Sequence, residues 1–172
     1  MRYTIRQERP SDYPEINELV KKSFATNADD DGTTHEYLNA LRGKDVFIPQ
    51  LSLVAEAADG MLIGQIVLYK TTVTTSRGAV SELLLSPICV HPEYFRCGIA
   101  RALVAESLPI AFKLGYRAVF LCGDPRFYSR LGFVPSYQYN IRHIKEDTAE
   151  WSMVRELYSG ALNGVTGTIN TI

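Results

Sequence analysis

The feature that most constrains this chain is an extended segment, a short glycine-containing loop and a helix start that follow one another without a spacer over residues 86–104. The apolar run ends at Val90, and Gly98 and Ala100 keep bulky side chains off the loop. The first N–H groups of a helix have no intrahelical partner, and the helix macrodipole is positive there. The segment therefore predicts a diphosphate site on the backbone of residues 96–101.

Length and charge narrow the class of protein. The 172 residues suffice for a buried core without disulfides or metals, and we expect one domain over residues 1–172. The 18 lysines and arginines nearly balance the 19 acidic residues, and no basic stripe occurs. This balance disfavours nucleic acid as a partner and favours a small-molecule or peptide substrate.

The cysteines and the hydropathy pattern indicate the compartment. Three cysteines without a CxxC spacing, in a chain with no signal-peptide pattern, predict reduced thiols in a cytoplasmic protein. No apolar run approaches the roughly 20 residues that a transmembrane helix needs. We therefore expect no membrane partner.

The first fifty residues predict a strand and two helices. We expect a strand at 3–6, a helix after the capping residues 10–12 and a short helix at 36–42. Three consecutive aspartates mark residues 27–34 as a loop. This loop is either a solvated connection or a gate that attracts a cationic amine.

Extended segments dominate the middle of the chain. Strands at 51–57 and 61–75 flank an Asp-Gly turn, which predicts a hairpin. A further strand at 79–90 contains Pro87, which lacks a backbone N–H and marks a point where the strand splays from its neighbour. A splayed strand has free backbone groups to offer a ligand.

The second half predicts a crossover unit and a weakly structured tail. A helix at 99–114 leads to an apolar strand at 118–122, which completes a parallel crossover. Pro109 inside the helix should kink or divide it. The polar, threonine-rich tail at 150–172 predicts one strand and a loosely structured end.

A second informative segment follows the strand at 118–122. Asp124 is placed to cap a helix and Pro125 to occupy its first position, so a short helix begins directly after the strand. Tyr128 then lies about one turn inside this helix, and Gly132 ends it.

These two segments carry a family resemblance. The order Phe95-x-x-Gly98-x-Ala100 resembles the acyl-CoA-binding motif Gln/Arg-x-x-Gly-x-Gly/Ala of the GNAT superfamily of N-acetyltransferases, and Tyr128-x-x-x-Gly132-Phe133 resembles its tyrosine signature. Phe95 replaces the Gln/Arg, and its ring could pack beneath the loop. The segments 90–94, 123–125 and 157–164 are similar to the YhbS-like group of that superfamily.

The resemblance implies a fold and a cofactor. The fold is α/β, with a central mixed, mostly antiparallel sheet flanked by helices and a splayed strand pair, ending near Val90 and Cys122, that forms the acyl-CoA cleft. The co-substrate is acetyl-CoA, and no metal is expected. Pantetheine would bind the strand edge and the diphosphate the loop, which together involve Ile88, Cys89, Val90, Arg96, Cys97, Gly98, Ile99, Ala100 and Arg101.

The resemblance also suggests catalytic roles. Tyr128 would be the general acid, because a phenol is protonated at neutral pH and can protonate a departing thiolate. Glu82, through a water, and His91 are alternative groups for deprotonating the amine, and the sequence does not choose between them. A covalent route through Cys89 or Cys97 is disfavoured, because no base is placed beside either thiol.

The function that follows is direct transfer of an acetyl group to an amine in a ternary complex. A dinucleotide oxidoreductase is excluded, because no early βαβ unit carries a GxGxxG fingerprint. The alternative is an acyl-CoA sensor without turnover, for which Phe95 argues and against which Tyr128 argues. The resemblance implies that the acceptor approaches from residues 29–37 and 135–139. Their carboxylates and aromatic rings favour a small or peptidyl cationic amine. A homodimer is left open.

Overall fold

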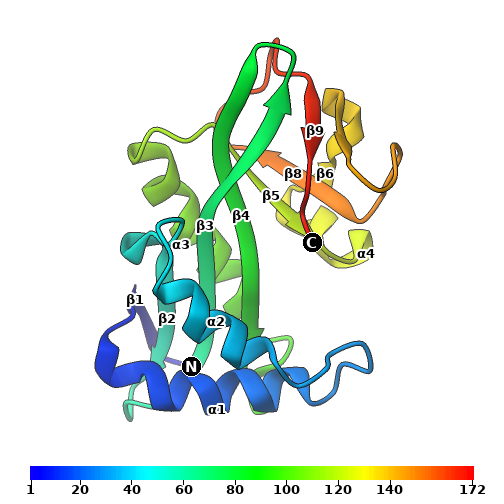
Figure 1. Cartoon of the computed structure of the whole chain (residues 1–172). Coiled ribbons are helices and arrows are strands. Elements are labelled where there is room, and N and C mark those ends of the chain that lie inside the picture. The colour runs from blue at the N-terminus through cyan, green and yellow to red at the C-terminus, as the bar shows by residue number, and fades with distance from the viewer. The chain divides into compact units, whose positions relative to one another are not determined.

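The computed structural model describes residues 1–172 and divides into two compact units. The first comprises Met1–Leu68 with Ser86–Ile110, and the second comprises Tyr69–Leu85 with Ala111–Ile172. Figure 1 shows the elements along the chain. The helices are α1 (Tyr13–Phe24), α2 (Thr34–Arg42), α3 (Ile99–Lys113) and α4 (Pro125–Tyr128), and the strands are β1 (Tyr3–Gln7), β2 (Ser52–Ala57), β3 (Leu62–Thr75), β4 (Gly78–Val90), β5 (Ala118–Cys122), β6 (Val134–Pro135), β7 (Ile141–His143), β8 (Ser152–Glu156) and β9 (Gly167–Ile169).

The strands form a mixed sheet, as the sequence predicts. Hydrogen-bonded neighbours follow the order β1-β2-β3-β4-β5-β8-β6, and β9 pairs with both β3 and β7. The β4–β5 and β7–β9 pairs are parallel, whereas β1–β2, β2–β3, β3–β9, β5–β8 and β6–β8 are antiparallel. None of the helices has the length and apolar character needed to cross a membrane.

In the first unit, helices cover both faces of the sheet formed by β1, β2 and the first part of β3. Figure 1 shows α1 and α2 in front of these strands and the start of α3 behind them. The apolar positions of α1, Ile16, Leu19 and Val20, are buried as their helical spacing predicts. The turn at Asp59 closes the predicted hairpin, where Ala57 N–H donates to the carbonyl of Met61 at 2.9 Å.

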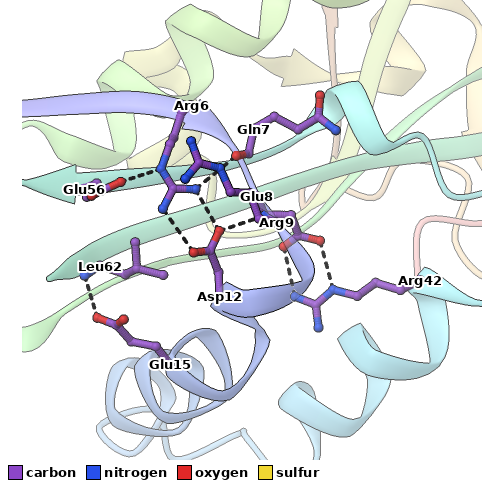
Figure 2. A network of polar contacts seen from close by, with 9 residues as sticks. All are labelled: Arg6, Gln7, Glu8, Arg9, Asp12, Glu15, Arg42, Glu56 and Leu62. Atoms are coloured by element: carbon purple, nitrogen blue, oxygen red, sulfur yellow. Dashed lines mark hydrogen bonds and ion pairs between the residues drawn. The ribbon is translucent and has the colours of Figure 1, made fainter. Parts of the chain in front are cut away.

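A polar network joins the elements of the first unit (Figure 2). The Glu8 carboxylate binds the Arg42 guanidinium through two hydrogen bonds of 2.9 Å each, and both side chains are buried. Arg42 also lies over the ring of Tyr13, 3.8 Å from its centroid. Arg6 binds the carboxylates of Asp12 and Glu56. The network ties α2 to the junction of β1 and α1.

In the second unit, β5 is the central strand. It is parallel to β4 in the register Leu83↔Val119 and antiparallel to β8 in the register Phe120↔Val154. Apolar side chains from the unit's strands and tail form one buried cluster, namely Val73, Leu84, Ala118, Phe120, Ile141, Val154, Leu162, Val165 and Ile169. The parallel pairing of β4 with β5 lies before Pro87.

Two sequence predictions about local structure are wrong. Helix α3 is not divided at Pro109, which is an exposed residue of one continuous helix, while a kink at this position stays a prediction. The tail is not loosely structured, because it forms β8 and β9 and buries Leu162 and Val165. The Glu156 carboxylate orders the connection by accepting the Gly160 and Leu162 N–H groups.

Candidate active site

Residues 88–90, predicted to bind pantetheine, lie at the end of β4. Ile88 and Val90 are partly exposed, whereas Cys89 is only 3% exposed. The Val90 N–H donates to the Ser23 hydroxyl of α1 at 3.3 Å. Burial raises the pKa of Cys89 to about 12, so its thiol stays protonated and is a poor nucleophile.

The loop after β4 turns sharply into α3. His91 caps a short 3₁₀ turn at Pro92–Tyr94, and its Nδ1 accepts the Glu93 N–H at 3.3 Å. Two left-handed residues follow, Arg96 with φ 63° and Gly98 with φ 80°. Gly98 supplies this conformation without a Cβ penalty, whereas the same conformation at Arg96 is uncommon for a residue with a side chain.

The first turn of α3 leaves amides available for an anion. Ala102 N–H donates to the Gly98 carbonyl at 3.0 Å, which closes the first helical turn. By helix geometry, the N–H groups of Ile99 and Ala100 have no intrahelical partner. Arg96, Cys97 and Gly98 are exposed. We call residues 96–101 the cradle, and their binding of a diphosphate stays a prediction.

Gly64 of β3 positions the start of α3, a role that the loop and helix motifs do not predict. A Cβ at Gly64 would lie 2.7 Å from Ile99 Cγ2 and 3.0 Å from Leu103 Cδ1. Ile99 and Leu103 are 1% and 0% exposed, so the start of α3 is packed directly on the backbone of β3. A glycine in the interior of an apolar strand is the signal that indicates such a close approach.

Phe95 does not pack beneath the loop. Its side chain is 43% exposed, which overturns the expectation of a buried ring. The reason lies in the backbone, because Phe95 is extended (φ −58°, ψ 143°) and is followed by the left-handed Arg96. The cradle therefore has an exposed aromatic ring where the family motif has a polar side chain.

Tyr128 lies in the second unit, on a helix built as the sequence predicts. Asp124 caps α4 by accepting the Arg126 N–H at 2.9 Å, and Pro125 is the first helical residue. The Tyr128 ring lies against Gly123, where an added Cβ would be only 2.2 Å from Cε2. Burial raises the pKa of Tyr128 to about 12. The phenol is therefore protonated at neutral pH.

Glu82 is fully buried and already has hydrogen-bond donors around it. Its carboxylate accepts the Arg117 Nε–H at 2.8 Å and the backbone N–H groups of Arg117 and Ala118 at 3.1 Å each. These bonds fix the start of β5 and favour a structural role for Glu82. The participation of Glu82 or His91 in catalysis stays a prediction.

In segment 29–37, the carboxylates of Asp30 and Asp31 accept hydrogen bonds from their own loop. Asp30 accepts the Gly32 N–H at 2.9 Å and the Thr34 hydroxyl at 2.6 Å, and Asp31 accepts the Thr33 N–H at 2.9 Å. These bonds shape the loop before α2. In the second unit, the Tyr137 hydroxyl donates to the Glu150 carboxylate.

Comparison with known proteins identifies the class. The family model described as "Acetyltransferase (GNAT) domain" matches residues 4–136, which is more than half of the chain and includes the cradle and Tyr128. The chain belongs to this family of acetyltransferases, as its motifs predict. It is thus a GNAT enzyme by family, with the mixed sheet of that fold.

Individual relatives show which group of the family this chain resembles. The chain is 34% identical to the N-acetyltransferase YhbS of Escherichia coli K12 over 165 residues, which cover 96% of this chain and 93% of that protein. The solved structure of Escherichia coli YhbS in complex with CoA has a TM-score of 0.85 and 31% identity, covering 100% of this chain and 91% of that one. A GNAT acetyltransferase from Brucella melitensis in complex with acetyl-CoA has a TM-score of 0.78 and 25% identity, with coverages of 98% and 95%. The predicted similarity to the YhbS-like group is confirmed.

Proposed function

We propose that this protein transfers an acetyl group from acetyl-CoA directly to an amine within a ternary complex. The observation that carries the proposal is the cradle at residues 96–101, where two left-handed residues lead into an exposed helix start. The solved relatives in complex with CoA and acetyl-CoA support the choice of cofactor. The diphosphate binds the first amides of α3, with Arg96 and Arg101 contributing charge.

The strand end polarises the thioester in this proposal. Pantetheine runs along Ile88–Val90 as an added strand, and a backbone amide donates to the thioester carbonyl. Because the Val90 N–H is bonded to Ser23, the Ile88 and Cys89 amides are the better candidates for this donor.

The chemical step needs a base and an acid. The amine nitrogen attacks the thioester carbon, the C–S bond breaks, and the CoA thiolate takes the proton of the Tyr128 hydroxyl. The acceptor ammonium first gives one proton to a base, and after attack the nitrogen gives up a second proton, which restores the Tyr128 hydroxyl. Since the fully buried Glu82 carboxylate already accepts three donors, we assign this role to the partly exposed His91.

The acceptor class is a cationic primary amine. Asp29 and Glu36 remain exposed beside the folded aspartate loop, and both favour a positively charged substrate. We further propose that residues 1–172 act as one cytoplasmic acetyltransferase domain.

Ligand-linked stability tests the cradle. Saturating acetyl-CoA should raise Tm, and Gly98→Asp should abolish this rise, because the new side chain adds bulk and negative charge at a left-handed position. Gly78→Asp, at another left-handed glycine with open space around it, is the matched control and should keep the rise. An unchanged rise in the Gly98 variant would refute the cradle.

Turnover separates the enzyme from a sensor. Acetyl-CoA is incubated with polyamines, lysine-containing peptides, aminoglycosides and acidic amino acids, and free CoA thiol is measured. An enzyme releases thiol with the cationic members, whereas a sensor binds acetyl-CoA without release. Faster release with the acidic members would contradict the acceptor class.

A further inference from the structure

The second unit contains a buried polar cluster that the proposed chemistry does not use. Ser136, His143, Ser152 and Thr171 are each at most 4% exposed. The Ser152 hydroxyl lies 3.3 Å from that of Ser136 and accepts the Thr171 hydroxyl at 3.4 Å. His143, at the end of β7, is the titratable member of the cluster.

Both ring nitrogens of His143 face backbone N–H groups. Lys145 N–H points to Nδ1 at 3.1 Å, and Thr171 N–H points to Nε2 at 3.2 Å. A neutral imidazole accepts at one nitrogen, whereas an imidazolium accepts at neither. Protonation therefore removes the acceptor and places a buried charge against two donors.

The same histidine is connected, through Trp151, to Gly123, the residue against which the Tyr128 ring lies. The His143 ring lies edge-on to the Trp151 ring, with centroids 4.5 Å apart. The Trp151 carbonyl accepts the Gly123 N–H at 2.9 Å. The Tyr128 ring lies directly on Gly123. A single chain of contacts therefore leads from His143 to Tyr128 within one unit.

We propose that His143 is a positioning residue whose neutral form holds Trp151 and Gly123 in place beneath Tyr128. The inference rests on the proposed function, because it assigns His143 a role only through the catalytic acid. Protonation of His143 removes its one acceptor nitrogen and loosens the contact with Trp151. Acidification then lowers turnover without changing the cradle.

The charges around His143 are mixed. On its own segment, Lys145 lowers and Glu146 raises the tendency to protonate, while Arg142 is paired with Asp147 at 3.6 Å. On the segment after β9, a hydrogen bond with the Asn170 side chain raises the tendency to protonate, and Thr171 presents its backbone N–H. Ser152 of β8 and Ser136 of the turn before β7 are uncharged. Burial is the dominant effect and holds the pKa of His143 below its ordinary value. The neutral form is thus the resting state at pH 7.

Trp151 is the only tryptophan of the chain and reports on this contact directly. Its emission should change in one transition as the pH falls, with a midpoint below the ordinary histidine value of about 6.5. His143→Gln, which keeps an acceptor but does not titrate, should lack the transition. Glu146→Gln is the matched control, because Glu146 accepts the Trp151 Nε1–H at 3.2 Å, and it should keep the transition. Absence of the transition in the wild type, or its persistence in His143→Gln, overturns the inference.

Two further measurements follow the Gly123 amide and the turnover number. Hydrogen exchange at the Gly123 amide should lose protection across the same pH range in the wild type and not in His143→Gln. With the fastest amine of the panel, the ratio of wild-type kcat to His143→Gln kcat should fall about tenfold per pH unit below the midpoint, at constant KM for acetyl-CoA. A constant ratio rejects positioning. The fluorescence and exchange results hold even for a protein without turnover, so the two proposals fail separately.

Discussion

Gln65 of β3 shows how a single buried residue can oppose stability. Its side chain is fully buried beside Val54 of β2, and neither amide atom has a hydrogen-bond partner. A buried amide without partners costs free energy, because it loses its bonds to water and gains none in the fold.

Replacing Gln65 with methionine should therefore stabilise the protein. Gln65→Met keeps the unbranched shape and should raise the free energy of unfolding by about 1–3 kcal/mol. Gln7→Met, at an exposed position, is the control and should change it little. Chemical denaturation measures both. A loss of stability in Gln65→Met would mean that the amide binds a group in solution.

The Tyr128 hydroxyl can be tested without disturbing its ring. Tyr128→Phe should lower turnover by about 10²-fold or more while leaving acetyl-CoA affinity within a few-fold. Because the pKa of Tyr128 is raised to about 12, this acid stays protonated as the pH rises through 9 and 10. The pH–rate profile should therefore lack an alkaline decline from Tyr128 in that range. Full activity of the variant would assign the proton to another donor.

At the scale of elements, the ion pair between Glu8 and Arg42 decides how firmly α2 is held (Figure 2). Both side chains are less than one-tenth exposed, so removing one partner leaves the other charge buried and unpaired. Removing the Arg42 side chain also removes its contact with the Tyr13 ring.

Arg42→Ala should therefore destabilise the protein by about 3–5 kcal/mol, measured by denaturant unfolding. The double variant Arg42→Met with Glu8→Leu should recover most of this loss, because no charge remains unpaired. The exposed pair of Lys21 with Glu18 provides the comparison, and Lys21→Ala should change the stability little. A similar cost for both single variants would contradict the assigned role of burial.

Local sequence signals predicted most elements, whereas long-range contacts escaped them. Helix α1, strand β5 and the Asp124 cap follow from apolar spacing, an apolar run and capping chemistry within a few residues. Strand β9 does not follow from the sequence, because its polar, threonine-rich segment has no alternation of apolar and polar residues. Its pairing partner, β3, is also distant in the sequence. The same limit hid the bond between Glu82 and Arg117, which are 35 residues apart. The site motifs are local, so the sequence predicts the turn into α3 and the capped helix that carries Tyr128. Their long-range supports, Gly64 and Trp151, do not follow from local sequence.

At the scale of the whole molecule, the two compact units share continuous elements. β3, β4 and α3 each begin in one unit and end in the other. Unfolding either unit breaks strands and a helix that the other unit needs. We expect one cooperative thermal transition, with equal calorimetric and van't Hoff enthalpies. Two resolved transitions would show two independent folding units and would count against a single domain.

The cysteines make the protein a ready target for chemical footprinting. Cys97 is exposed in the cradle of the first unit, Cys122 is exposed at the end of β5 in the second, and Cys89 is buried. Burial raises the pKa of Cys122 and, more strongly, that of Cys89. Because thiolates are the reactive species, an alkylating reagent should modify Cys97 first, Cys122 more slowly and Cys89 only on unfolding. Mass spectrometry of the native chain then measures modification of the first unit at Cys97 and of the second at Cys122. Acetyl-CoA bound at the cradle should protect Cys97 from the reagent.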